Sequence, residues 1–154
     1  MEKTVFLTQA GFDKFKNELE YLRSYKRAEI ANRLREAMRF DEDQVDVEYQ
    51  MTKDEQSLVE GRIQELERLL GRARILEFKK SNGKVIMGST VTVKEEGRDP
   101  EEFTIVSSAE ANSILRLISD ESPLGSSLLG RHVGDEIEVS APKGTLKFQI
   151  LGVK

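Results

Sequence analysis

Acidic side chains crowd a short segment in the first half of the chain. Residues 41 to 48 contain five of them and no Lys or Arg, namely Asp41, Glu42, Asp43, Asp46 and Glu48. Carboxylate oxygens are hard ligands of the kind that Mg²⁺ prefers, and Mg²⁺ readily shares its coordination sphere with phosphates. We therefore expect Glu42, Asp43 and Asp46 to hold Mg²⁺ only together with ligands from a partner, because the segment alone has too few for a nuclease. The alternative is a solvated loop whose negative charge favours the start of the following helix.

The residues before the acidic segment have the apolar periodicity of a long helix. Steps of three and four separate most apolar positions, as on one face of an α-helix. Thr8 precedes them as a candidate N-cap, and Lys26 interrupts the apolar face. The apolar positions are Phe12, Phe15, Leu19, Leu22, Ile30, Leu34 and Ala37.

A heptad seam follows the acidic segment, polar near its start and apolar further along. Only a few residues, around 41–47, separate the two helices, so they must run antiparallel. A helix of roughly 30 residues at ~1.5 Å each is about 45 Å long. Residues 1–78 are thus predicted to form an antiparallel coiled-coil hairpin with residues 41–48 as its acidic tip. The seam positions are Tyr49, Thr52, Gln56, Val59, Ile63, Leu66, Leu70 and Ala73.

The second half of the chain, residues 79–154, changes to short segments rich in β-branched residues. Several alternate apolar with polar residues at period two and are bounded by Gly, Pro or Asp. We expect strands near 85–87, 89–93, 102–106, 136–139 and 145–150, and a short helix near 126–129. Lys143-Gly144 is a candidate hairpin loop. The predicted class is therefore α+β, with a helical hairpin followed by a small antiparallel β domain.

The overall composition excludes several classes of protein. The net charge of -4 argues against a protein that coats nucleic acid by bulk attraction. The absence of cysteine excludes disulfides and thiolate chemistry. The N-terminus lacks the apolar run of a signal peptide, and no segment is apolar enough to span a membrane. We expect a cytoplasmic protein.

The chain resembles the Gre family of bacterial transcript-cleavage factors over essentially its whole length. The similarity lies in ordered motifs at the family's spacing, densest in the second half. These motifs are Glu48-Tyr49, Asp54-Glu55-Gln56, Glu60-Gly61-Arg62-Ile63, Gly83-Lys84-Val85, Gly88-Ser89-Thr90-Val91, Ile118-Ser119-Asp120-Glu121-Ser122-Pro123-Leu124-Gly125, Leu128-Leu129-Gly130, Gly134-Asp135 and Pro142-Lys143-Gly144.

The resemblance implies a fold and a partner. It implies an N-terminal coiled-coil hairpin and an FKBP-like C-terminal domain that docks on bacterial RNA polymerase. The hairpin would enter the secondary channel and stimulate cleavage of the nascent RNA 3′ end in backtracked complexes. The polymerase would be the enzyme, and the tip acids Asp41, Glu42, Asp43 and Asp46 would act in trans beside its Mg²⁺. We expect the protein to be a monomer and to have no cofactor of its own.

The acidic tip departs from the family pattern of acid, two residues, acid, then Asn-Ala-Glu-Tyr. Aligned on Glu48-Tyr49, Glu42 takes the first acid position, but Val45 takes the second and cannot ligate a metal. One alternative is that Asp43 and Asp46 replace the usual pair. The other is that the chain resembles the inhibitory homologues, which occupy the channel without promoting cleavage.

Other candidate contact residues flank the tip or lie in the second half. Arg39, Tyr49 and Lys53 could contact RNA or polymerase, although neutralisation of neighbouring acids explains the two cations equally well. Ser122, Pro123, Leu124 and Gly125 resemble the polymerase-docking segment, against the alternative of a plain turn leading into a helix.

Two rival functions have weaker support. A prolyl isomerase needs an aromatic-lined pocket, and residues 81–154 contain only Phe103 and Phe148 as aromatic residues. An adaptor that binds another coiled coil would display apolar residues at the far end of the hairpin, where the seam is polar. His132 is the single histidine and is expected on a surface loop.

Overall fold

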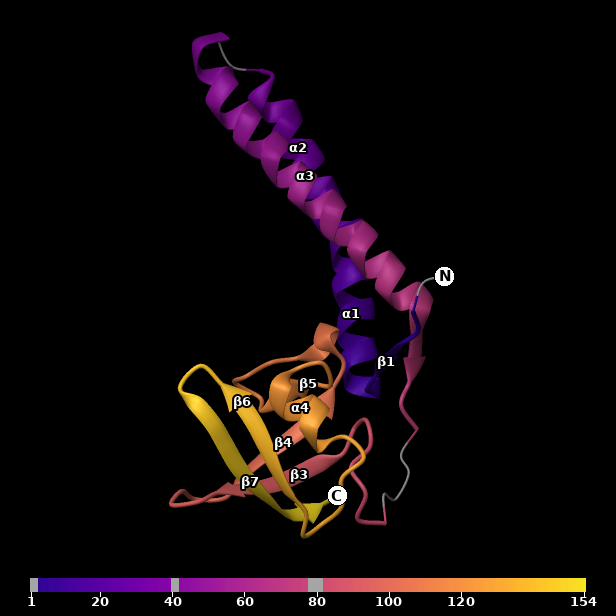
Figure 1. Cartoon of the computed structure of the whole chain (residues 1–154). Helices are drawn as coiled ribbons and strands as arrows, with labels where there is room; N and C mark the ends of the chain where they lie inside the picture. The colour runs from indigo at the N-terminus through magenta and orange to yellow at the C-terminus, as the bar shows by residue number, and fades with distance from the viewer. Residues whose placement is uncertain (1–2, 40–41, 78–81) are drawn as a thin grey trace. The chain divides into compact units, whose positions relative to one another are not determined.

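The computed structural model describes residues 3–39, 42–77 and 82–154, and the side chains at 42–46 lie outside that description. The chain forms two compact units. The first comprises Met1–Lys3 and Ala10–Ala73, and the second comprises Thr4–Gln9 and Arg74–Lys154. The first is a helical hairpin and the second is a β domain with short helices (Figure 1).

The first arm of the hairpin contains a π-helical segment between two α-helices. Helix α1 spans Gln9–Tyr21, the π-helix η1 spans Leu22–Lys26, and α2 spans Arg27–Ala37. The amide of Arg27 donates to the carbonyl of Leu22, the i→i+5 bond of a π turn. The seam positions Leu22, Lys26 and Ile30 are separated by two successive steps of four residues. A heptad alternates steps of three and four, so this stretch contains one additional residue. The wider turn absorbs that residue and keeps the seam facing the second arm.

The second arm is the single helix α3, Glu42–Arg72, which lies beside α2 (Figure 1). Its start corrects the expectation of a connecting loop over 41–47, because most of the acidic segment has helical backbone. Acidic residues stabilise a helix N-terminus through its dipole, which explains why this segment extends the helix. Most of the predicted seam is confirmed, but Leu69 is buried in place of the expected Leu70, which is half-buried. Its most buried members across the two arms are Phe15, Leu19, Ile30, Ala37, Thr52, Ile63 and Leu66.

The β domain contains a five-stranded sheet of order β5-β4-β3-β7-β6. Its neighbours pair antiparallel except for β4 and β5, which are parallel. The strands are β3 Thr90–Glu95, β4 Glu101–Val106, β5 Leu117–Ser119, β6 Glu136–Ala141 and β7 Gly144–Val153. The short helices are the 3-10 helix η2, Ser108–Glu110, and α4, Pro123–Leu128.

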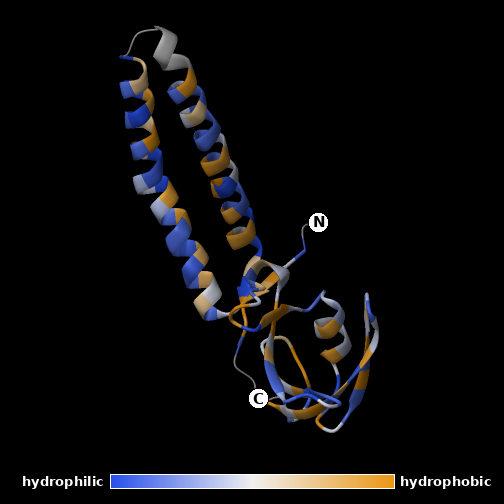
Figure 2. Cartoon of the chain, turned by 90° about the vertical axis from the view of Figure 1, so that its left-hand side faces the viewer, coloured by the Kyte–Doolittle hydropathy of each residue, from blue (hydrophilic) through white to orange (hydrophobic). Residues whose placement is uncertain are grey.

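The core of the β domain lies between the sheet and α4. Leu128 of α4 is fully buried together with apolar residues from alternate positions of β3, β6 and β7. Figure 2 shows this alternation as orange and blue positions in turn along the strands. Burial of each such aliphatic side chain contributes about 1.5–3 kcal/mol relative to exposure. No helix of the described residues is both long and apolar enough to cross a membrane.

The predicted fold class is confirmed, with several differences in detail. Strand β5 and its parallel pairing with β4 were not predicted, and the short helix expected near 126–129 spans Pro123–Leu128. Residues 85–87 do not form the expected strand, because Val85 bonds through its backbone to the loop residues Gly130 and Arg131. A two-stranded sheet of β1, Val5–Leu7, and β2, Ala73–Ile75, was not predicted. The hairpin loop expected at Lys143-Gly144 is present between β6 and β7.

Candidate functional site

The acidic tip, as far as the structure describes it, lies at the start of α3 (Figure 1). Asp41 falls outside the described residues. Glu42, Asp43 and Asp46 belong to the first turns of α3, and their side chains also fall outside the description. Among the side chains that are described, no three acidic or histidine groups converge as a metal site would require. The expectation that Glu42, Asp43 and Asp46 hold Mg²⁺ therefore stays a prediction about side chains outside the description.

The candidate contact residues beside the tip lie on both arms. Arg39 follows the end of α2, where its amide donates to the carbonyl of Glu36 at 3.0 Å, and its side chain is exposed. On α3 the Lys53 ammonium lies 5.7 Å from the centre of the Tyr49 ring, within the range of a cation–π contact. The same ammonium is 3.5 Å from the Gln56 side-chain oxygen. Lys53 and Tyr49 therefore form one local cluster, and Arg39 is positioned by the backbone at the turn.

Charged pairs connect the two arms of the hairpin along its length. Opposite charges meet because antiparallel packing places residues beside the seam of one helix next to those of the other. The pairs are Glu18–Arg62, Arg23–Glu67 and Arg27–Glu60, at 2.7 Å, 2.5 Å and 2.8 Å.

Lys26, which interrupts the apolar seam, belongs to a network of four charged residues. Its ammonium lies 3.0 Å from Glu55 and 3.4 Å from Glu29. Arg33 lies 2.6 Å from Glu55 and 3.7 Å from Glu29. The hydrogen bond to Glu55 raises the pKa of Lys26, and hydrogen bonds from Lys26 and Arg33 lower the pKa of Glu55. The network keeps a lysine charged beside an otherwise apolar seam.

The candidate docking segment begins with the N-terminal cap of α4. The Ser122 hydroxyl oxygen accepts from the Gly125 amide at 3.0 Å and donates to the Ser119 carbonyl at 2.6 Å. Pro123 occupies the first turn, where its missing amide hydrogen costs nothing. The helix start is thus tied to the end of β5.

The four docking residues differ in their availability to a partner. Pro123 is exposed and Ser122 is half-buried, whereas Gly125 is buried. Leu124 is packed against the core of the β domain. Further polar groups lie near Ser122. The Ser108 hydroxyl is 2.8 Å from the hydroxyl of Ser119 and 3.1 Å from the carboxylate of Glu121. A partner would therefore meet Pro123 and Ser122 directly.

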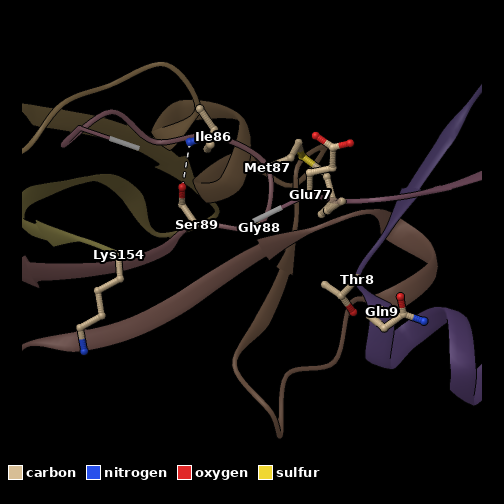
Figure 3. Close-up of a pocket in the computed structure, with 9 residues that line it drawn as sticks. Thr8, Gln9, Glu77, Ile86, Met87, Gly88, Ser89 and Lys154 are labelled. Atoms are coloured by element: carbon tan, nitrogen blue, oxygen red, sulfur yellow. Dashed lines mark hydrogen bonds between the residues drawn. The ribbon is translucent and has the colours of Figure 1, made fainter. Parts of the chain in front are cut away.

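A pocket of about 200 Å³ in the β domain bears on the isomerase alternative (Figure 3). Among the described residues, none of those that line it is aromatic, and they are Thr8, Gln9, Leu76, Glu77, Ile86, Met87, Gly88, Ser89 and Lys154. The described lining mixes charged, polar and aliphatic groups. His132 is exposed, as predicted, and lies in an isolated antiparallel bridge to Lys84, where its amide donates to the Asp135 carboxylate.

The far end of the hairpin is less polar than the seam pattern predicts. Val47 and Met51 are 66% and 65% exposed there, although a polar end had been expected. The seam pattern missed them because they lie outside the heptad positions. Their signal in the sequence is the spacing of four residues, which places two apolar side chains on one face of a helix.

Comparison with known proteins identifies relatives along the whole chain. Residues 5–75 match the family described as transcription elongation factor, N-terminal, and residues 80–154 match that described as transcription elongation factor, GreA/GreB, C-term. The transcription elongation factor GreA of Clostridium acetobutylicum is 44% identical over 155 residues, covering 99% of this chain and 98% of that protein. GreA of Chloroflexus aurantiacus is also 44% identical, covering 99% of each chain.

A solved structure is also similar in sequence to this chain. The GreA factor homolog 1 of Thermus thermophilus is 34% identical, covers 99% of each chain and superposes with a TM-score of 0.46. The two family matches together span nearly all of the sequence, and the relatives are similar over their full lengths. The chain therefore belongs to the GreA/GreB family of transcription elongation factors.

Proposed function

We propose that this chain binds bacterial RNA polymerase, inserts its hairpin through the secondary channel, and stimulates cleavage of the RNA 3′ end in backtracked complexes. The observation that carries the proposal is the acidic segment at the end of a hairpin in a member of this family. The chain would act as a cytoplasmic monomer. It would modulate the cleavage activity of the polymerase rather than be an enzyme itself.

The dimensions of the hairpin support the proposed reach. Helix α3 has 31 residues, which corresponds to about 46 Å at ~1.5 Å per residue. The inter-arm pairs, such as Arg27 with Glu60, add links along this length between the apolar layers of the seam. Exposed pairs contribute little stability individually, but each bidentate one favours a single alignment of the arms. The hairpin can therefore present its tip at a defined distance from its base.

The chemistry proposed for the tip is assistance to a metal that the polymerase already uses. Carboxylate oxygens fit the hard ligand preference of Mg²⁺, which when bound polarises a phosphate and lowers the pKa of a coordinated water. Positions 43 and 46 are three apart in helical backbone, a spacing that places two residues on the same face. This spacing supports Asp43 and Asp46 as the acid pair in place of the position that Val45 occupies.

The remaining contacts would be supplied by charge and by the second domain. Arg39 and Lys53 carry positive charge on either side of the acidic segment, where an RNA 3′ end would bring phosphates. The Ser122–Pro123 cap of α4 would contribute to docking through its exposed edge. In this proposal the docking surface provides affinity and the tip provides the effect on cleavage.

A transcript-cleavage assay tests the proposal. The chain is added to backtracked elongation complexes with 3′-labelled RNA, and short 3′ fragments are measured beside samples without the chain. Faster release of fragments is expected. Reduced nucleotide addition without fragments would instead assign the chain to the inhibitory class. Failure to bind polymerase in any form would refute the whole proposal.

A further inference from the structure

A groove runs between the two arms of the hairpin close to the acidic tip. It has a volume of about 280 Å³ and is lined by residues of both α2 and α3. Two small buried residues, Ala37 and Thr52, are part of the lining, and the Thr52 hydroxyl donates to the Glu48 carbonyl at 2.8 Å. The proton of the Thr52 hydroxyl is therefore already used within α3, and Ala37 has no polar side-chain atom.

The charges that line the groove are unbalanced. Arg33 is the one cation among the described residues of the lining, and its guanidinium is engaged by Glu55 at 2.6 Å. Glu36 and Glu48 also line the groove, and neither carboxylate has an ion-pair partner among the described side chains. The groove therefore carries net negative charge, which attracts a basic partner and repels nucleic acid.

An apolar stripe on α3 continues from the groove. Met51 lines the groove, and Val47 and Leu58 lie about 40° and 20° from it around the helix at ~100° per residue. Val47 is 66% exposed, Met51 is 65% exposed and Leu58 is 76% exposed. The stripe is about 16 Å long at ~1.5 Å per residue, which is about three turns of a partner helix. Exposed apolar side chains in such a row indicate a protein contact rather than solvent.

Acidic residues border this stripe on both sides. Glu48 and Asp54 each lie about 60° from Met51 around α3, in opposite directions. Both side chains are exposed, and the side-chain amide of Gln50 donates a hydrogen bond to the Asp54 carboxylate. A row of apolar residues between two acidic borders is complementary to a helix with an apolar face flanked by Lys or Arg.

We propose that the groove and the stripe of Val47, Met51 and Leu58 bind a basic amphipathic helical segment of RNA polymerase. This inference depends on the proposed function, because it places the contact within the complex with polymerase. The methionine suits such a contact, since its flexible thioether adapts to a partner surface. The segment would fix the depth and rotation of the hairpin near the acidic tip.

Site-specific photocross-linking tests this contact. The chain has no cysteine, so Met51→Cys creates a single thiol to which a benzophenone maleimide can be coupled. The matched control is Ser57→Cys on the same helix, exposed but about 120° around from Met51. Both labelled chains are irradiated in stalled elongation complexes, and adducts are separated on denaturing gels and identified by mass spectrometry. Their helix content is checked by circular dichroism beforehand.

The expected adduct joins the Met51 position to a polymerase peptide that contains Lys or Arg beside apolar residues, in clear excess over the Ser57 control. The double variant Glu36→Lys, Glu48→Lys should weaken binding to the complex by about tenfold through reversed charge. An RNA adduct, an adduct to a second copy, or equal yields at the two positions would overturn the inference. If the unmodified chain binds polymerase and only the Met51 excess is missing, the proposed function survives. If it does not bind, both fail.

Discussion

The Lys26 ammonium lies 3.0 Å from the Glu55 carboxylate, and this contact joins the π-helical segment of the first arm to the middle of α3. The Lys26 side chain is only 22% exposed, because its position belongs to the seam. A polar residue at a seam position lowers stability but specifies the alignment of two helices. The pair therefore fixes the register of the arms at the point where the π turn absorbs an additional residue.

A double-mutant cycle on this pair measures the coupling. Glu55→Gln removes the carboxylate that Lys26 and Arg33 share, so it should lower Tm by a few degrees. Lys26→Met retains the length of the side chain and should cost less, because the new residue suits the seam. The double variant should be more stable than the two separate effects predict. Strict additivity in thermal unfolding would mean that Lys26 and Glu55 do not interact.

Stability should also depend on pH through the carboxylates of the inter-arm pairs. Hydrogen bonds from Lys26 and Arg33 lower the pKa of Glu55 below its ordinary value of 4.5, and Arg27 does the same for Glu60. A lowered folded-state pKa stabilises the fold above the unfolded pKa, and this contribution is lost as pH falls through the folded value. We expect Tm to fall between about pH 5 and pH 3. Glu55→Gln with Glu60→Gln should flatten that slope, and a slope unchanged in this variant would refute the assignment.

The sequence predicts the hairpin well because its periodicity is local. Ile63 and Leu66 occupy seam positions that the pattern identified, and both are at most 1% exposed. The π turn was not predicted, because Lys26 is polar. The apolar pattern therefore does not show the two successive four-residue steps from Leu22 to Ile30 that a π turn accommodates. The start of α3 was missed because the crowded acids suggested a loop, whereas the helix dipole favours them.

Contacts between distant parts of the chain have no such local signal. Strand β1 pairs with a strand more than 60 residues later, and the Thr8–Glu110 contact spans 102 residues. The docking residues could be identified by resemblance, but their exposure could not. Only the structure separates the exposed Pro123 from the buried Gly125.

The contact between Thr8 and Glu110 should stabilise the N-terminal part of the β domain. The Thr8 amide and hydroxyl donate to the two oxygens of the Glu110 carboxylate, at 2.8 Å and 2.5 Å. Hydrogen bonds to a charged group contribute about 1.5–3 kcal/mol, so Glu110→Ala should destabilise the fold by that order. Glu110→Gln keeps one acceptor and should cost less. Hydrogen exchange at Leu7 and Thr8 reports the effect, and unchanged protection in Glu110→Ala would contradict it.

Variants of the acidic tip separate cleavage from binding. Asp43→Ala or Asp46→Ala should abolish cleavage stimulation, because each removes a proposed metal-directed carboxylate, while affinity for polymerase stays the same. Glu20→Ala is a suitable control, since Glu20 is an exposed acid on α1 far along the chain from the tip. Val45→Glu should retain or increase cleavage by supplying the second acid of the family pattern. Full cleavage activity in both alanine variants would show that other groups act at the tip.

The docking segment gives the last prediction, in which affinity and stability should separate. Pro123 is exposed, so Pro123→Ala should weaken binding to polymerase, by about tenfold if this residue is an anchor of the interface. Its Tm should change little, because alanine also suits the first turn of a helix. Leu124→Ala should do the reverse and lower Tm, since Leu124 packs against the core of the β domain.

Binding is measured by fluorescence anisotropy of a labelled chain titrated with polymerase, and Tm by calorimetry. Ser122→Ala removes the cap that bonds Gly125 and Ser119, so it should cost about 1 kcal/mol and also affect binding. If Pro123→Ala lowers Tm as much as Leu124→Ala does, its effect on affinity is structural. If it leaves affinity unchanged, the polymerase meets another face of the β domain, because α4 presents Pro123 as the exposed member of this segment.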